Sequence, residues 1–293
     1  MQTRFPRGRG PALPRLAAIG IVSLLWACSG PSEPSGRANV PDAPLPLAGA
    51  HNLRDLGGHP AADGLRIKHG VVYRSDALSH LTDADLRRVA DLGLRTVVDF
   101  RIDQEIELEG PYRLPEEQDI RRVSLPIHPA DSAGYLQRLL AGQVEEAAET
   151  TEYMTDLYAT VALDHAREYR ALVDAVLEPD GTPLLFHCTA GKDQAGIASA
   201  LLLRLVGAPM EAIEANYLAS PAARLPEDVE LFDGIDPALL EPMLGVDVAY
   251  LRAAFAKIDL VYGSFDAYAE TALGVDAEKR RRLMRLLTEP IEG

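Results

Sequence analysis

One stretch of the chain decides the fold: Pro183-Leu-Leu-Phe-His-Cys-Thr-Ala-Gly-Lys-Asp-Gln-Ala-Gly-Ile-Ala-Ser-Ala-Leu-Leu-Leu203. Apolar residues open it, a loop containing Gly191 and Gly196 follows, and apolar residues resume from Ile197. This pattern predicts a buried strand, a short loop and a helix. In that arrangement the backbone N–H groups of the loop and the positive end of the helix dipole point at one spot. The stretch therefore predicts an anion-binding loop.

Cys188 stands at the first position of this loop and is the candidate nucleophile. The same amides and dipole that attract an anion stabilise a thiolate. A buried cysteine acting only as a small apolar side chain is the alternative, but the position between a strand and a glycine-containing loop favours chemistry. A thiolate facing an anion site predicts in-line attack on a phosphate ester. Such a reaction needs an ionised sulfur, a cradle for three oxygens and a proton for the leaving oxygen.

The composition is that of a globular protein, with 47% hydrophobic and 25% charged residues among 293. A formal net charge of -15 argues against nucleic acid as a partner, because phosphate backbones require a basic surface. The seven histidines show no paired spacing with cysteine or acidic residues that is typical of metal ligands. We therefore expect neither a metal nor another cofactor.

The N-terminus has the pattern of a targeting segment. Four arginines precede an apolar run, residues 16–27, that is too short to span a bilayer. The run ends in Leu25-Trp26-Ala27-Cys28, which resembles the cleavage box of bacterial lipoproteins. We expect residues 1–27 to be a signal peptide and Cys28 to carry lipid, so that the protein is exported and anchored to a bacterial membrane, on the periplasmic side or at the cell surface. An ordinary secretory signal or an uncleaved anchor is the alternative.

Residues 28–45 are rich in proline, serine and glycine, which predicts a flexible linker to a single domain over residues 46–290. Cys28 and Cys188 are the two cysteines of the sequence. A lipid on Cys28 excludes an intramolecular disulfide and leaves Cys188 as a free thiol.

Apolar periodicity predicts an α/β fold around the loop. Strands are expected at residues 71–75, 95–100 and 121–125, and Thr82 and Asp85 have the spacing of a capping box that opens a helix. Strands alternating with helices predict a sheet of mainly parallel strands with helices on its faces. Residues 145–177 and the chain after the loop predict helices, and His165 lies on an apolar stripe as a core histidine.

The loop resembles that of the bacterial tyrosine/dual-specificity phosphatases, His-Cys-x-x-Gly-Lys-Asp-Arg-Thr-Gly. Residues 52–58, 73–76, 97–101 and 262–268 also look like landmarks of that family, so the resemblance spans about residues 48–288. It implies the α/β sandwich of the cysteine phosphatases with a helical C-terminal part. It also implies a phosphorylated protein or phospholipid as substrate: phosphotyrosine, phosphoserine/threonine or a phosphoinositide.

The residues of the loop take defined roles in this reading. Cys188 is the nucleophile, Lys192 adds positive charge, Asp193 is the first choice for the general acid, and Asp131 is the second. His187 is expected to set the loop through a hydrogen bond. Substrate-binding residues are expected in the loop and, by resemblance, at two arginines: Thr189, Ala190, Gly191, Lys192, Gln194, Ala195, Gly196, Arg54 and Arg101.

Two residues depart from the family pattern: Gln194 stands in place of the loop arginine and Ala195 in place of the following hydroxyl residue. Arginine binds two phosphate oxygens through a charged planar fork, whereas glutamine offers a neutral amide. Losing one preorganised donor costs on the order of 10²–10³ in rate. The sequence therefore supports two hypotheses: hydrolysis through a phosphocysteine at reduced rate, or a pseudophosphatase that binds phosphorylated ligands. A rhodanese-like sulfur carrier is disfavoured by the Gly-Lys-Asp spacing.

Overall fold

The computed structural model describes residues 44–128, 132–222, 232 and 234–291. The chain divides into residues 1–38 and residues 39–293, and all described residues belong to the second unit. The predicted signal peptide, the lipidated Cys28, nearly all of the linker and Asp131 lie outside the described residues. Everything below concerns the second unit.

A five-stranded sheet with the order β1-β3-β6-β4-β5 lies at the centre of this unit. Its strands are β1 (Arg54–Asp55), β3 (Val72–Ser75), β6 (Leu184–His187), β4 (Thr96–Asp99) and β5 (Arg121–Ser124). β1 runs antiparallel to β3, and every other pair is parallel. The prediction of a mainly parallel sheet is confirmed. Because β6 is the middle strand, the loop that follows it starts beside the carboxyl ends of β3 and β4.

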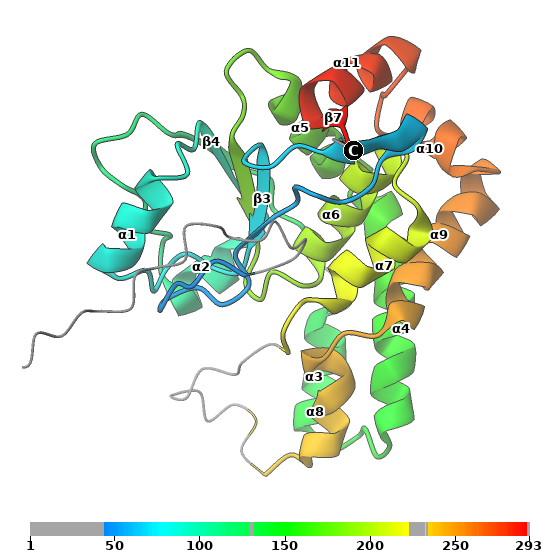
Figure 1. Ribbon diagram of the computed structural model, residues 1–293. Helices are drawn as coiled ribbons and strands as arrows, with labels where there is room; N and C mark the ends of the chain where they lie inside the picture. The colour runs from blue at the N-terminus through cyan, green and yellow to red at the C-terminus, as the bar shows by residue number, and fades with distance from the viewer. Residues whose placement is uncertain (1–43, 129–131, 223–231, 233, 292–293) are drawn as a thin grey trace, which may run out of the picture. The chain divides into compact units, whose positions relative to one another are not determined.

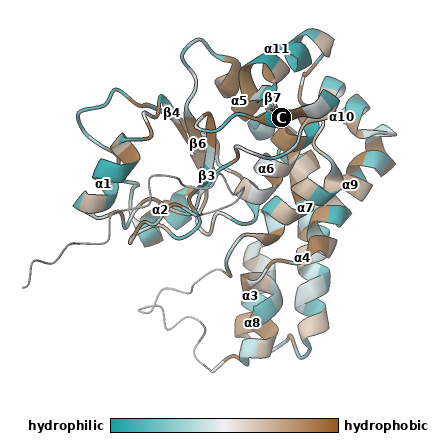
Figure 2. Cartoon of the chain, viewed as in Figure 1, coloured by the Kyte–Doolittle hydropathy of each residue, from teal (hydrophilic) through white to brown (hydrophobic). Residues whose placement is uncertain are grey.

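Helices cover both faces of the sheet (Figure 1). Alternate strand residues explain this: Leu184 and Phe186 of β6 belong to one apolar core, and Leu185 belongs to the other. The inner strands β4 and β6 are accordingly brown, the hydrophobic colour, in Figure 2. Outside this sheet, β2 (Leu65–Ile67) and β7 (Thr288–Pro290) form a separate two-stranded antiparallel sheet. The helices are η1 (Ala62–Gly64), α1 (Asp83–Ala90), α2 (Asp103–Glu109), α3 (Ser132–Leu140), α4 (Ala147–Asp164), α5 (Ala166–Leu177), α6 (Gln194–Leu205), α7 (Met210–Leu218), α8 (Pro237–Leu244), α9 (Val248–Tyr262), α10 (Phe265–Thr271) and α11 (Ala277–Leu287).

Helix α6 starts at the end of the predicted anion-binding loop and is buried on all sides. Eleven of its 12 residues are buried, as expected for a helix without a polar face. Its residues pack against α7 as well as against β3 and β6. The loop is therefore held between two buried elements, β6 and α6, and its backbone has little freedom to move.

Two sequence expectations need correction in detail. The helical stretch 145–177 is two helices, α4 and α5, which meet at His165. This half-buried residue has its Nε2 2.7 Å from the carbonyl oxygen of His128, so it is a junction residue more than a core one. The chain after the loop is not helical to its end, because Thr288–Pro290 pairs with β2, where Arg66 binds Glu289. No helix among the described residues is long and apolar enough to cross a membrane.

The predicted capping box at Thr82 and Asp85 is formed. Asp85 also accepts hydrogen bonds from the backbone N–H groups of Ala48 and Gly49, each at 3.0 Å. Burial raises the pKa of Asp85, but the hydrogen bonds from Ala48, Thr82 and Gly49 outweigh it and lower that pKa to about 2. One carboxylate thus fixes both the start of α1 and the segment that leads to β1.

We predict that Asp85→Ala lowers the free energy of unfolding at pH 7 by about 2–4 kcal/mol, because several backbone N–H groups lose their acceptor. Since the folded pKa is depressed, the carboxylate stabilises the fold above pH 4, and this contribution disappears as the pH falls toward 2. Urea unfolding of the native protein and of Asp85→Ala at pH 7 and pH 3 measures the difference in their free energies of unfolding. This difference should be smaller at pH 3. Asp83→Ala is the control, because the Asp83 side chain is 82% exposed. A loss as small as that of the control would contradict the prediction.

Candidate active site

The loop after β6 is held through its carbonyl groups. The carbonyl of Thr189 accepts a hydrogen bond from Ala77 N at 3.0 Å, and that of Ala190 accepts one from Asn52 Nδ2 at 3.0 Å. The carbonyl of Gly191 accepts one from Arg74 Nη2 at 2.6 Å. In a trans peptide the N–H points opposite to the C=O. The amides of these three peptides therefore face the inner side of the loop, as an anion-binding loop requires.

Gly191 is required at its position for two reasons. Its φ of +68° lies in the left-handed region that side chains rarely adopt. A Cβ there would lie 2.5 Å from the backbone nitrogen of Asp76 and 2.6 Å from the carbonyl carbon of Ser75. The loop can therefore pass this close to the end of β3 only with glycine.

Two backbone amides of this segment reach the sulfur of Cys188. Gly191 N–H donates to Sγ at 3.2 Å, and the backbone N–H of Ala195 also lies on the sulfur. Burial nevertheless raises the pKa of the Cys188 thiol to about 12, and the charges of Asp193 and Glu105 act in the same direction against the two amides. The five largest contributions to that pKa include no lysine or arginine. Gln194 places a neutral amide where the family pattern has a charged arginine.

Lys192 and Asp193 form an ion pair at the edge of the loop. The buried ammonium of Lys192 donates to Asp193 Oδ1 at 2.8 Å. Tyr158 of α4 donates to the same oxygen at 2.5 Å. The charge that Lys192 brings is thus shared with the carboxylate, and Asp193 is held from two sides.

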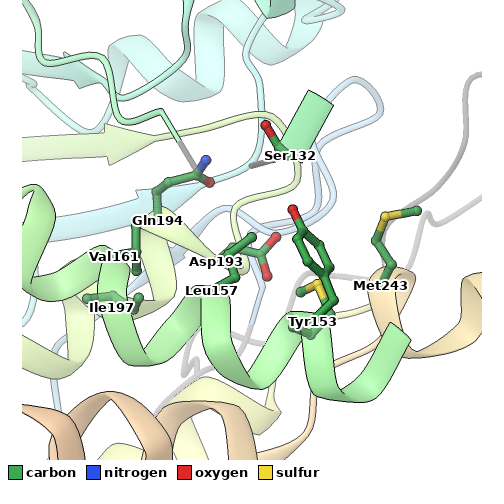
Figure 3. Close-up of a pocket in the computed structure, with 9 residues that line it drawn as sticks. Ser132, Tyr153, Leu157, Val161, Asp193, Gln194, Ile197 and Met243 are labelled. Atoms are coloured by element: carbon green, nitrogen blue, oxygen red, sulfur yellow. The ribbon is translucent and has the colours of Figure 1, made fainter. Parts of the chain in front are cut away.

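A cavity of about 130 Å³ borders the loop at Asp193 and Gln194 (Figure 3). Its wall is mostly apolar and comes from α3, α4, α6 and α8: Ser132, Tyr153, Met154, Leu157, Val161, Ile197 and Met243. Figure 3 shows the side chains of Asp193 and Gln194 at this space. Cys188 itself does not line it, so the cavity is suited to the organic part of a ligand whose anionic end lies in the loop.

Thr189, Gly196 and His187 contact other parts of the protein and do not line the cavity. Thr189 Oγ1 donates to Glu105 Oε1 at 2.8 Å, and Gly196 allows the ring of Tyr217 to pack at 3.1 Å from the position of a Cβ. His187 is buried, and burial lowers its pKa to about 4. A hydrogen bond with the backbone of Cys188 and the charge of Asp99 act against this lowering of the His187 pKa. Asp99 lies 3.8 Å from Nδ1, and the Tyr112 ring packs edge-on against the imidazole. The expected role of His187 in setting the loop stays a prediction.

The two arginines predicted to bind substrate are buried and bonded to the protein. Arg101 forms two-pronged hydrogen bonds with Asp99 and also reaches Glu109 at 3.4 Å. Arg54 lies behind the loop, where it donates to Asn52 Oδ1 and to Asn216 O. Neither lines the cavity beside Asp193 and Gln194. A contact of either with substrate stays a prediction.

Sequence reasoning missed three residues that hold the site: Asn52, Arg74 and Tyr158. Asn52 and Arg74 lie in segments that resemble family landmarks, and this was the available signal for them. Tyr158 lies on the apolar stripe of a helix and carries no signal of its own. Among the described residues no group of three or more His, Cys, Asp or Glu is arranged to hold a metal ion.

A thiol at the carboxyl end of a central parallel strand, bonded by two amides at a helix N-terminus, is an arrangement suited to binding a phosphate group. Comparison with known proteins agrees: a family model described as the tyrosine phosphatase family matches residues 45–289. The chain belongs to the tyrosine phosphatase family, whose members are phosphatase enzymes.

Among its relatives is a Cupriavidus necator protein named as a tyrosine-protein phosphatase, 33% identical over 84% of this chain and 94% of the relative. The triple specificity protein phosphatase PtpB of Mycobacterium tuberculosis is 33% identical over 77% of this chain and 92% of its own length. Crystal structures of TpbA from P. aeruginosa, one of them with phosphotyrosine, cover 67% and 68% of this chain at 19% and 23% identity, with TM-scores of 0.28 and 0.27. Because these TM-scores are low, the description of the fold rests on the sheet order given above and not on these structures.

We predict that the reactivity of Cys188 rises about tenfold for each pH unit between 7 and 10, because the thiolate reacts and the pKa is raised to about 12. A Cys28→Ser chain leaves one cysteine, so iodoacetamide labelling followed by mass spectrometry reports Cys188 alone. Gln194→Arg in that chain should raise the rate at pH 7 and make it level off at a lower pH. A rate that is already constant above pH 8 without the arginine would contradict the raised pKa.

Proposed function

We propose that the protein hydrolyses phosphate monoesters through a phosphocysteine on Cys188. Phosphotyrosine is the first substrate to test, followed by phosphoserine/threonine and phosphoinositides. The observation that carries the proposal is the sulfur of Cys188 bonded by the backbone N–H groups of Gly191 and Ala195, at the N-terminus of buried α6. The names of the relatives, tyrosine-protein phosphatase and triple specificity protein phosphatase, support the same reaction and these substrate classes.

The reaction has two steps. In the first, the Cys188 thiolate forms the S–P bond while the P–O bond to the leaving group breaks, and the leaving oxygen takes a proton from a general acid. In the second, water forms a new O–P bond, the S–P bond breaks, and the water proton returns to the same group. The amides of the loop bind the equatorial phosphate oxygens in both steps, where their dipoles face the developing charge.

Asp193 is the general acid in this proposal. Its carboxylate lines the cavity beside the loop, its side chain is 26% exposed, and it is close enough to Cys188 to raise the pKa of the thiol. Asp131, the second candidate from the sequence, lies outside the described residues. Lys192 contributes by holding Asp193 Oδ1 and by adding positive charge beside the phosphate.

A second candidate function is favoured by Gln194. Burial and two carboxylates dominate the raised pKa of the thiol, and a neutral amide stands where the family pattern has arginine. Both features lower the rate of the first step more than they lower phosphate binding by backbone amides. A pseudophosphatase that binds phosphorylated ligands without turnover is the consequence if the rate is lost altogether.

Hydrolysis of p-nitrophenyl phosphate tests the proposal. We expect turnover by the native chain, none by Cys188→Ser, and a gain of about 10²-fold with Gln194→Arg, the worth of one preorganised donor. Gln143→Arg places the same charge on an exposed turn after α3 and should leave the rate unchanged. If the native chain is inert, and Cys188→Ser still binds a phosphotyrosine peptide by calorimetry, the pseudophosphatase replaces the enzyme.

The proposal includes the location of the protein outside the cytoplasm, tethered to the membrane by lipid on Cys28. Its support is the sequence of residues 1–28: arginines, a short apolar run and the Leu-Trp-Ala-Cys box. Mass spectrometry of the mature protein from membranes should find an N-terminus at Cys28 with acyl chains. An unacylated N-terminus beyond residue 28 would contradict the anchor.

A further inference from the structure

Two buried tyrosines form a hydrogen-bonded chain that ends on the loop. Tyr217 of α7 donates to the hydroxyl of Tyr158 at 3.0 Å, and Tyr158 of α4 donates to Asp193 Oδ1 at 2.5 Å. Both tyrosines are fully buried, with exposures of 1% and 0%. These two hydrogen bonds connect helices α7 and α4 to the carboxylate proposed as the general acid. Neither tyrosine belongs to the loop.

The direction of the two hydrogen bonds follows from the number of protons that each hydroxyl carries. A tyrosine hydroxyl has one proton, and because Tyr158 accepts from Tyr217 its own proton goes to Asp193. Burial, together with the neighbouring Asp193 and Tyr217, raises the pKa of Tyr158 well above its ordinary value of 10.0. Tyr158 therefore remains a donor throughout the pH range of an enzyme assay.

These contacts distinguish the two oxygens of Asp193. Oδ1 accepts from Tyr158 and from Lys192, whereas Oδ2 has no hydrogen-bond partner among the described residues. The carboxylate borders the apolar cavity, with Gln194 beside it. With Oδ1 held by two donors, Oδ2 is the oxygen left to exchange a proton with a ligand.

The ring of Tyr158 is itself locked in place. It packs against the ring of Tyr217 at 5.9 Å between centroids and against that of Tyr250 at 5.6 Å. Another buried tyrosine, Tyr268, satisfies its hydroxyl with a backbone carbonyl, that of Ala162, at the same distance of 2.5 Å. Tyr158 instead donates to the partly exposed carboxylate of Asp193. A buried hydroxyl does not need such an acceptor, because a backbone carbonyl would satisfy it equally well.

We propose that Tyr158, backed by Tyr217, is a positioning residue that holds Asp193 so that its free oxygen delivers a proton to the leaving oxygen in the cavity. This inference rests on the proposed function. In the first step the proton passes from Asp193 Oδ2 to the leaving oxygen as the P–O bond breaks; in the second, Asp193 regains it from water. Tyr158 keeps its own proton throughout and touches no reacting atom.

The test compares two leaving groups. Phenolate is a strong base and needs a proton to depart, whereas p-nitrophenolate departs without one, so loss of proton transfer harms phenyl phosphate selectively. We expect Tyr158→Phe to lower kcat/KM about 10–100-fold for phenyl phosphate and less than about 3-fold for p-nitrophenyl phosphate. Tyr217→Phe should act in the same direction with a smaller effect. Tyr268→Phe removes a buried hydroxyl that binds the same helix and should change neither value.

Asp193→Asn completes the experiment as a double-mutant cycle. Because Tyr158 acts through Asp193, Tyr158→Phe should cause no further loss in the Asp193→Asn background. Equal losses on both substrates, or additive losses in the cycle, would show that Tyr158 only supports the fold and would overturn the inference while the proposed function stands. Absence of turnover in both the native chain and Gln194→Arg would overturn the proposed function and the inference with it.

Discussion

The structure depends on one constraint: three consecutive carbonyl groups of the loop after β6 are bonded from behind, so that their amides face the inner side of the loop, where Gly191 N–H donates to Cys188 Sγ. The bonds come from the segment before β1, from β3 and from the turn after it. Arg74 of β3 is held in turn by Asn216 of α7 at 2.7 Å. Each layer of the unit thus contributes to the orientation of a few peptide planes, and peptide planarity transmits that orientation to the inner side of the loop.

The same arrangement places a thiol among carboxylates. Glu105 of α2 accepts from Thr189 and from the backbone N–H of Ile102, which ties the start of the loop to α2. Asp193 is fixed by Lys192 and Tyr158. Both carboxylates raise the pKa of Cys188, so the groups that rigidify the loop also oppose ionisation of its nucleophile. Gln194 removes the charge that the family pattern places against them, and the amides of Gly191 and Ala195 lower the pKa of the thiol without that arginine.

Strands β3, β4, β5 and β6, the loop followed by a helix, and the capping box of α1 could be predicted from sequence because each depends on neighbours within a few residues. Thr82 and Asp85 are three apart, and Leu184, Leu185 and Phe186 form an apolar run just before the loop. The break at His165 and the strand β7 escaped prediction, since a periodic stripe does not show where a helix bends or which distant edge strand a tail meets. The expectation that Arg101 binds substrate was made without knowledge of its partners Asp99 and Glu109.

By itself the sequence determined the candidate nucleophile, the glycine that the loop needs and the neutral residue at 194, because these are properties of residue type at fixed spacing. Only the tertiary structure decided which side chains hold the loop. Asn52 reaches Ala190 across 138 residues, and Tyr158 reaches Asp193 across 35. The physical reason is that local periodicity records whether a side chain is buried, whereas its hydrogen-bond partner depends on the strand order and on which helices pack together. The position of Asp193, the proposed general acid, was decided at that level.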